Sequence, residues 1–315
     1  MKILIAYDGS HCAEAALDDL VRVGLPIEGE ACVVTVAQVW LPPPDSAEQT
    51  DEFLEQMLAK HRERGKRLLN EAEIISKHAA ARVKVALPAW SVKHLATYGS
   101  PGWEILSAVD EMDPELIIVG SHGHSLLSRL QLGSISQKVL AEAKASVRIA
   151  RGKVEVDPAP CRIVVGFDGS RGAHAAVEIV KARKWPTGTE VRLVAATDSV
   201  VPTAIGRFIP SVVDWAEEES IEEHQWIERA LFDEARSLTA AGLIADTQMI
   251  EGNPKDVLVR IAENWHADCI FVGANAFGSS LERFLLGSTS AAIASRASCS
   301  VEVVRIPAKE DLLRS

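Results

Sequence analysis

Short runs of consecutive apolar residues alternate with longer helical segments along the whole chain. In the first half, the apolar runs cover residues 2–7, 31–37, 91–98, 115–119 and 146–150. Helices are predicted between them, at residues 10–23, 49–86, 101–112 and from 133 onward. Continuous apolar strands separated by helices are typical of a parallel sheet that is covered on both faces. The pattern therefore predicts an α/β fold.

Local signals set several boundaries of these elements. Ser10 is a good N-cap for the helix that follows it. The prolines at 42–44 cannot continue a strand ladder, because they lack an N–H group. The long helix is expected to end before Pro88, but its last residues, 83–85 (Val-Lys-Val), also favour a strand. The sequence leaves this boundary open.

The second half of the chain repeats the first. Its strands are predicted near residues 161–167, 189–197, 243–250, 268–272 and 299–305. Residues 163–170 (Ile-Val-Val-Gly-Phe-Asp-Gly-Ser) match residues 3–10 (Ile-Leu-Ile-Ala-Tyr-Asp-Gly-Ser), at an offset of 160 residues. This is far longer than a solenoid repeat of about 20–50 residues. We therefore expect two tandem domains, at residues 1–152 and 160–308, joined by a short polar linker that contains two prolines.

The first half contains a glycine motif directly after its fourth apolar run. Residues 120–123 (Gly-Ser-His-Gly) are followed, after nine further residues, by Gly133 and Ser134. Glycines let a backbone approach an anion closely, and the N–H groups of such a loop and of the next helix point at its charge. The hydroxyl groups of Ser134 and Ser136 would add donors. Because similar loops without a phosphate ligand are common, the glycines alone leave both interpretations open.

The second half carries a changed copy of this motif. Gly273 and Gly287 correspond to the first and last glycines, but thirteen residues separate them instead of twelve. Ala276 stands where the middle glycine would fall, and Gly278 follows two residues later. An added Cβ atom and an extra residue would move the N–H groups of the loop relative to a phosphate. This site would bind through Gly278 with a reshaped loop, bind more weakly, or be vestigial; we favour weaker binding.

Composition excludes several classes of protein. A length of 315 residues suits two domains. The formal net charge of −11 argues against a nucleic-acid surface, which needs clustered Lys and Arg. No apolar run approaches the about 18–20 residues of a membrane span, and Met1-Lys2 leads directly into a strand, so we expect neither a membrane partner nor a signal peptide. The five cysteines lack any Cys-x-x-Cys spacing, which is typical of free thiols in a cytoplasmic protein.

Other catalytic and metal motifs are missing. The sequence contains no Gly-x4-Gly-Lys-Ser/Thr, no Gly-x-Gly-x-x-Gly, no Gly-x-Ser-x-Gly and no His-Glu-x-x-His. His122 and His124 make an incomplete metal site, and a role facing solvent or phosphate is favoured for both. The acidic residues between 217 and 223 are interpreted as the solvated face of a helix.

Three motifs together resemble the universal stress protein family. They are the Asp-Gly-Ser after each first strand, the Gly-Ser-Pro at 99–101 with its counterpart Gly-Asn-Pro at 252–254, and the Gly-x2-Gly-x9-Gly-Ser that begins at Gly120. The resemblance covers nearly the whole chain, and the last motif is similar to that of the ATP-binding subclass. It implies two doubly wound domains, each with a five-stranded parallel sheet in the order 3-2-1-4-5 and helices on both faces. Strands 1 and 4 would then diverge at a ligand-binding crevice.

The resemblance also implies roles for individual residues. Asp8 and the backbone of Val36 would contact adenine, Gly120 and Gly123 would lie along the ribose and first phosphates, and Gly133 would hold the outer phosphates. Without the loop, Asp8 and its two neighbours would be interpreted as a turn and a helix cap. The complete predicted nucleotide-binding set is Asp8, Val36, Gly120, His122, Gly123, His124, Gly133, Ser134, Ser136, Asp168, Ala196, Gly273, Gly278, Gly287, Ser288 and Ser290.

Three functional hypotheses remain open. The first is an ATP-binding regulatory protein of the stress response, in which nucleotide changes stability or partner choice. The second is a slow ATPase that uses Mg²⁺ bound through the phosphates, although no residues are arranged for phosphoryl transfer. The third is a scaffold without nucleotide. The resemblance further implies that the last strands of the two halves meet across a two-fold axis as an internal pseudo-dimer, and a homodimer is a further possibility. The sequence identifies no protein partner.

Overall fold

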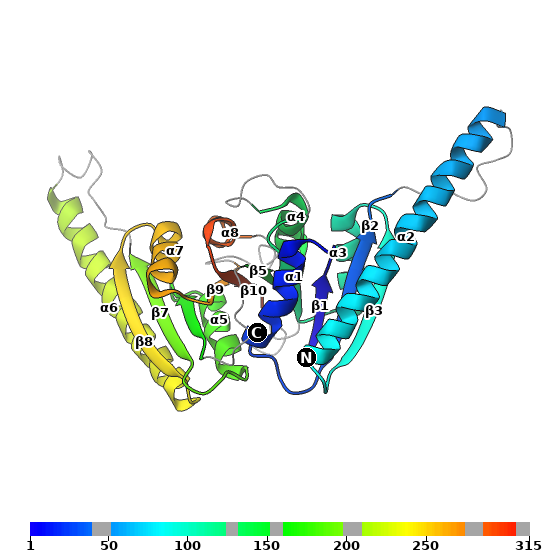
Figure 1. Ribbon diagram of the computed structural model, residues 1–315. Helices are drawn as coiled ribbons and strands as arrows, with labels where there is room; N and C mark the ends of the chain where they lie inside the picture. Colours follow the sequence, from blue (N-terminus) through cyan, green and yellow to red (C-terminus); the bar gives the residue numbers. More distant parts are fainter. Residues whose placement is uncertain (40–51, 124–131, 152–159, 198–209, 275–285, 307–315) are drawn as a thin grey trace. The chain divides into compact units, whose positions relative to one another are not determined.

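The computed structural model describes residues 1–39, 52–123, 132–151, 160–197, 210–274 and 286–306, and the chain divides into two compact units (Figure 1). Unit 1 consists of Met1–Val21 and Pro26–Val156. Unit 2 consists of Asp157–Ser315 together with the short segment Arg22–Leu25. A segment of the first half of the chain thus belongs to unit 2, which the sequence repeat did not predict.

Unit 1 is a doubly wound α/β domain. Its elements are β1 (Lys2–Ala6), α1 (His11–Asp18), the short 3-10 helix Asp19–Arg22 at the unit boundary, β2 (Glu30–Ala37), α2 (Glu52–Ala86), β3 (Ser91–Tyr98), α3 (Pro101–Met112), β4 (Leu116–Gly120), α4 (Ser134–Glu142) and β5 (Ser146–Ala150). The strands pair in parallel in the order β3-β2-β1-β4-β5. This confirms the order 3-2-1-4-5 expected from the family resemblance.

Unit 2 repeats the arrangement. Its elements are β6 (Arg162–Gly166), α5 (Arg171–Ala182), β7 (Glu190–Thr197), α6 (Pro210–Ala240), β8 (Ile244–Glu251), α7 (Pro254–Trp265), β9 (Cys269–Gly273), α8 (Ser288–Arg296) and β10 (Ser300–Val304). These strands pair in parallel in the order β8-β7-β6-β9-β10. The predicted duplication is therefore present in the topology as well as in the sequence.

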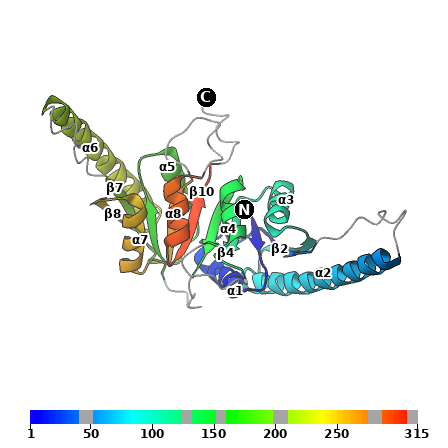
Figure 2. The ribbon, with the colours of Figure 1, turned by 90° about the horizontal axis from the view of Figure 1, so that it is seen from above.

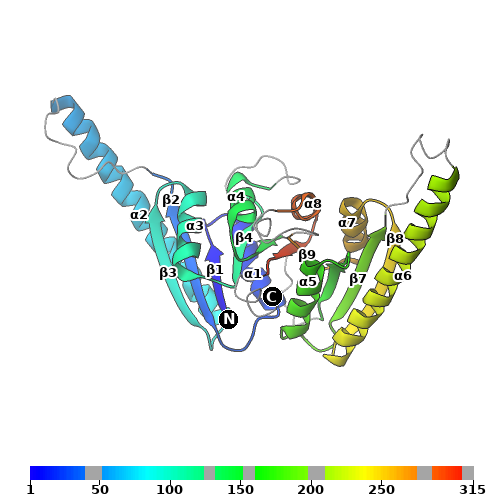
Figure 3. The ribbon, with the colours of Figure 1, turned by 180° about the vertical axis from the view of Figure 1, so that it is seen from behind.

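The helices cover both faces of the sheet in unit 1. Helices α1 and α2 lie in front of the sheet in Figure 1, and α3 and α4 lie in front of it in the opposite view of Figure 3. Right-handed crossovers between parallel strands require this change of face where the strand order reverses. The amino-terminal part of α2 extends beyond the strands on which the helix packs (Figures 1 and 2).

Two local predictions can be compared directly with the structure. Ser10 is the N-cap of α1, and its hydroxyl oxygen accepts the N–H of Ala13 at 3.3 Å. Residues 83–85 belong to α2 and form no strand. The Val83 side chain is fully buried, and its carbonyl accepts the N–H of Leu87 at 2.8 Å, which continues the helical pattern to the end. Tertiary packing thus overrides the strand propensity of Val83, whereas Val85 is exposed and follows the helix around it.

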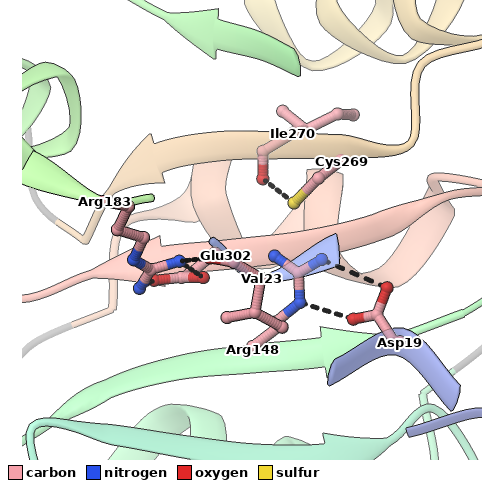
Figure 4. A network of polar contacts seen from close by, with 7 residues as sticks. All are labelled: Asp19, Val23, Arg148, Arg183, Cys269, Ile270 and Glu302. Atoms are coloured by element: carbon pink, nitrogen blue, oxygen red, sulfur yellow. Dashed lines mark hydrogen bonds and ion pairs between the residues drawn. The ribbon is translucent and has the colours of Figure 1, made fainter. Parts of the chain in front are cut away.

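Each unit carries a buried charge in its last strand (Figure 4). In unit 1, the Arg148 guanidinium of β5 donates to both carboxylate oxygens of Asp19, with Nε–Oδ2 at 2.5 Å and Nη2–Oδ1 at 3.2 Å. In unit 2, the Glu302 carboxylate of β10 accepts from Arg183, with Nη1–Oε2 at 2.8 Å. The strand residues around these charges are buried and apolar, as the sequence predicted, but the charges themselves sit in the core only because each has a partner.

Candidate functional site

The ends of β1 and β4 bring the two sequence signatures of unit 1 together. These strands are neighbours, with Ala6 opposite Val119, so the residues after them meet at the same edge of the sheet. The Asp8 carboxylate accepts the N–H of Ser10 at 3.0 Å through Oδ1. Its Oδ2 lies 2.8 Å from the position that a Cβ atom on Gly123 would occupy. The Asp8 turn and the glycine motif therefore form one site.

The start of α4 closes the same site. The Gly133 N–H donates to the Ser121 carbonyl at 2.9 Å, and a Cβ on Gly133 would lie 3.4 Å from the Cα of His122. The last glycine of the motif is thus hydrogen-bonded to the start of the motif. His124 and the rest of residues 124–131 lie outside the described part of the chain.

The amino terminus of α4 has no side-chain cap. Gly133 is the N-cap residue and contributes no capping hydrogen bond, whereas Ser10 caps α1. The hydroxyl of Ser136, in the first turn of α4, donates instead to the Gly120 carbonyl at 2.7 Å. The first N–H groups of a helix have no partner within the helix, and they carry the positive end of its dipole. Such an end is a ready anion site, and the Asp8 carboxylate borders the same motif at Gly123.

Val36 lies at the same edge of the sheet. It is the penultimate residue of β2 and stands opposite Thr97 of β3. Because β1 pairs with β2 only as far as Val34, the backbone of Val36 lies beyond the last paired residue of β1. This position is compatible with the predicted contact to a ligand that also reaches Asp8.

Unit 2 reproduces the framework of this site. The Asp168 carboxylate accepts the N–H of Ser170 at 3.0 Å, and the Ser290 hydroxyl donates to the Gly273 carbonyl at 2.6 Å. Gly287 is an N-cap without a side-chain hydrogen bond, and its N–H donates to the Ala274 carbonyl at 2.7 Å. The other predicted residues are distributed as follows: Ser288 is the exposed first residue of α8, Ala196 lies in β7 opposite Ile250, and Gly278 and Ala276 lie outside the described residues.

A polar cluster next to Asp8 escaped the sequence analysis. The Tyr7 hydroxyl donates to the Glu14 carboxylate of α1, which also pairs with Arg82 of α2. Arg82 pairs with Asp18 as well, at 2.8 Å. Burial raises the pKa of the Tyr7 hydroxyl above its usual 10.0, so it remains a donor at neutral pH. The cluster fixes α1 to α2 behind the site, and no sequence pattern indicated it because Arg82 lies far along the chain.

The surroundings of His122 in the site change its pKa. Its Nδ1 lies 3.1 Å from the Ser121 hydroxyl, and its Nε2 is buried with no hydrogen-bond partner in the described residues. Burial lowers the pKa of His122 below 6.5, and the positive charge of Arg151 lowers it further. His122 is therefore a neutral imidazole at pH 7, available to face a ligand.

We expect a measurable pH effect at His122. Because its folded pKa is lowered, the unfolded chain takes up a proton first as the pH falls from 6.5, and stability declines until the folded pKa is reached. An NMR titration of the imidazole, assigned with a His122→Asn variant, should give a midpoint below 6.5. A midpoint at or above 6.5 would contradict the prediction that burial and the positive charge of Arg151 lower the pKa of His122.

Two further properties follow from the described residues alone. Among them, no helix combines the length and the apolar character that crossing a bilayer requires. Within the same residues, no three side chains of His, Cys, Asp and Glu are grouped so that they would hold a metal ion. The site consists of backbone N–H groups, glycines and one carboxylate in each unit.

Known proteins match this chain over nearly its whole length. The family model described as the universal stress protein family matches residues 1–151 and again residues 161–305. The universal stress protein YxiE of Bacillus subtilis is 27% identical over 154 residues, which are 48% of this chain and 98% of that protein. A universal stress protein of Thermus aquaticus is 30% identical over 149 residues, 47% of this chain and 97% of that protein.

A solved structure shares the two-domain arrangement along the chain. The crystal structure of a universal stress protein from Archaeoglobus fulgidus covers 98% of this chain and 97% of its own, with a TM-score of 0.61 and 21% identity. At this identity the likeness shows the fold. The two separate matches of the family model show that the chain belongs to the universal stress protein family and contains two tandem domains of that family.

Proposed function

We propose that this protein binds ATP and acts as a nucleotide-dependent regulatory protein of the stress response. The observation that carries the proposal is the convergence in unit 1 of an Asp8 carboxylate and an uncapped helix start at Gly133. Both lie where β1 and β4 end and their connections diverge, which is where open α/β sheets bind ligands. A carboxylate that accepts hydrogen bonds and a positive helix end suit the two ends of a nucleotide.

The residues of unit 1 fit such a ligand. Asp8 and the Val36 backbone would contact the adenine. Gly120 and Gly123 would lie along the ribose and the first phosphates, and the N–H groups after Gly133 would bind the outer phosphates, with Mg²⁺ held through those phosphates. The cradle depends on missing side chains, since a Cβ on Gly123 would meet the Asp8 carboxylate. Ser136 would hold the start of α4 in place through its bond to Gly120.

Unit 2 would bind the same class of ligand through Asp168, Gly273 and Gly287. Its framework is equivalent, but the sequence of its loop has one extra residue and Ala276 in place of the middle glycine. We infer that unit 2 holds the phosphates less tightly than unit 1. The two units would then respond to different nucleotide concentrations.

The proposal extends to association of the two units through their last strands. In the sheet order of unit 1, β5 is an edge, and in that of unit 2, β10 is an edge. Bare strand edges favour pairing. An internal pseudo-dimer through these strands, with a homodimer as a further level of assembly, is therefore part of the proposal.

Titration of nucleotide-stripped protein tests the central claim. Isothermal titration with ATP should show a tighter transition that Asp8→Ala removes and a weaker transition that Asp168→Ala removes. Asp8→Asn is the matched control, because an amide oxygen still accepts the Ser10 N–H and preserves the turn. Two equal transitions, or a tighter one removed by Asp168→Ala, would contradict the proposed difference between the units.

Two simpler measurements separate the alternatives. Denaturing the purified protein and chromatographing the released small molecules should yield adenine nucleotide. Protein that releases none and shows no ATP binding after stripping would favour the scaffold without nucleotide. Single-turnover incubation with excess protein should leave bound ATP intact, whereas conversion to ADP would favour a slow ATPase.

A further inference from the structure

A tryptophan in unit 2 lies directly on the turn that carries Asp168. Trp226 projects from α6, and 52% of its surface is exposed. Its ring atoms Cη2 and Cζ3 lie 2.3 Å from the position that a Cβ on Gly169 would occupy. Gly169 has a φ of +73°, which favours glycine, and the lack of a side chain lets the ring rest against the backbone of the turn. A large aromatic face thus stands exposed beside the candidate site.

Among the residues of unit 1 that the structure describes, no ring lies at the equivalent turn. Gly9 has nearly the same conformation, with a φ of +76°, but the nearest atom to its Cβ position is the Cγ2 of Ile75 at 3.9 Å. Ile75 comes from α2, which corresponds to α6. The two units therefore share the Asp-Gly-Ser turn but differ in what covers it. The aromatic face belongs to the unit whose phosphate loop is altered.

The position of Trp226 is fixed by the packing of α6. Its neighbour Ile227 is buried, and so is Leu231 one turn later. Eight residues after Trp226, on the same side of the helix, Glu234 lies 2.7 Å from the Nδ1 of His174 in α5. His174 in turn packs edge-on against Phe167, with ring centroids 5.0 Å apart. Because α6 is anchored to α5 on this side, the tryptophan is held against the turn before any ligand arrives, and little order must be gained on binding.

We propose that Trp226 stacks on the base of the ligand in unit 2, so that unit 2 recognises a nucleobase more than a chain of phosphates. The inference rests on the proposed nucleotide-binding function and adds the chemical class that unit 2 selects. Stacking on an aromatic side chain is tolerant of base identity and contributes about five- to 150-fold in affinity by alanine substitution. Stacking would offset the weaker binding of the phosphates that is expected from the altered loop of unit 2.

The experiment compares ligands that share a base and differ in phosphates. ATP, ADP, AMP and adenosine are titrated into the stripped full-length protein, with Asp8→Ala and Asp168→Ala used to assign the units. At unit 1, affinity should fall steeply from ATP to adenosine. At unit 2, it should change less than tenfold, and adenosine should quench tryptophan fluorescence.

Substitution of the ring then tests its role. Trp226→Leu should weaken binding of all four ligands at unit 2 by about five- to 150-fold and leave unit 1 unchanged. Trp226→Phe keeps an aromatic face and should retain most of the affinity. This second variant keeps the test valid even if Trp226→Leu fails to fold. Phe232→Leu is the matched control, because Phe232 lies on the same helix and is 64% exposed.

Failure of the inference is distinguishable from failure of the proposed function. If Trp226→Leu binds at unit 2 like the unsubstituted protein, or if unit 2 loses affinity with each phosphate as unit 1 does, the stacking inference is wrong and the proposed function stands. If unit 1 binds ATP but unit 2 binds none of the four ligands, the inference is overturned together with the nucleotide binding proposed for unit 2, and the function proposed for unit 1 stands. If neither unit binds any of them, both proposals fail.

Discussion

Replacing Arg148 with alanine is expected to lower the free energy of unfolding by about 3–5 kcal/mol. The Arg148 side chain is fully buried, and its guanidinium donates to both carboxylate oxygens of Asp19, which is 2% exposed. Alanine would remove the guanidinium that binds both oxygens of this buried carboxylate. Removing one partner of a buried ion pair costs far more than the pair itself contributes, which is why a large loss is expected.

Urea denaturation followed by circular dichroism measures the effect. Arg67→Ala is the matched control, because Arg67 pairs with Glu63 at 2.5 Å while 73% and 65% of the two side chains are exposed. Its loss should stay within about 0.5 kcal/mol. The double variant Arg148→Met with Asp19→Leu should recover much of the loss, because no charge remains to be buried. Equal losses in Arg148→Ala and Arg67→Ala would contradict the role assigned to the buried pair.

This pair also marks a limit of prediction from sequence. The apolar runs predicted the strands, and the family resemblance predicted their order. The run at 146–150, however, gives no sign that its arginine points into the core, since its partner lies 129 residues away. A strand pattern shows which positions are apolar, but it does not show which distant side chain neutralises a buried charge. The same holds for Glu302 and Arg183.

The segment Arg22–Leu25 was missed for a related reason. The helical pattern assigned its first residues to the end of a helix in the first domain, and a duplicated chain predicts two independent modules. In the structure, the Gly24 carbonyl accepts the N–H of Lys184 at 2.9 Å, and Arg22 pairs with Asp268. The repeat describes what the two units share, and these contacts are specific to one of them.

The candidate site was predicted from sequence more fully than these contacts. Glycines and the Asp-Gly-Ser turn are local signals, and the strand order brings them to one edge. What the sequence does not separate is the reason for each glycine. A Cβ on Gly120 would lie 2.7 Å from the carbonyl carbon of Cys12, so this glycine is required by the approach of α1. A Cβ on Gly133 would have no atom closer than 3.4 Å, so the fold alone does not require this glycine.

That difference gives the second large effect, loss of nucleotide binding without loss of the fold. In the double variant Gly123→Ala with Gly133→Ala, the Cβ on residue 123 would meet only the movable end of the Asp8 side chain, and the Cβ on residue 133 would make ordinary van der Waals contacts with the backbone of residues 121–123. They would nevertheless occupy the surface where the N–H groups of the loop and of α4 face the phosphates. Each lost hydrogen bond to a charged phosphate costs about 1.5–3 kcal/mol, so two such losses should weaken ATP binding at unit 1 by a hundredfold or more.

In this variant, isothermal titration should therefore show that ATP binding at unit 1 is lost. Thermal unfolding should show that the melting temperature is nearly unchanged. Gly120→Ala is the matched control, because the same small substitution there collides with the backbone of α1 and should lower the melting temperature clearly. A double variant that keeps the full ATP affinity of unit 1 with an unchanged circular dichroism spectrum would show that the glycine motif is not the binding site. A double variant that unfolds would show instead that Gly123 and Gly133 serve the fold, as Gly120 does. The distinction rests on one physical contrast: a Cβ on Gly120 would collide with the backbone of α1, whereas a Cβ on Gly123 would meet a movable side-chain end and a Cβ on Gly133 would make only ordinary contacts.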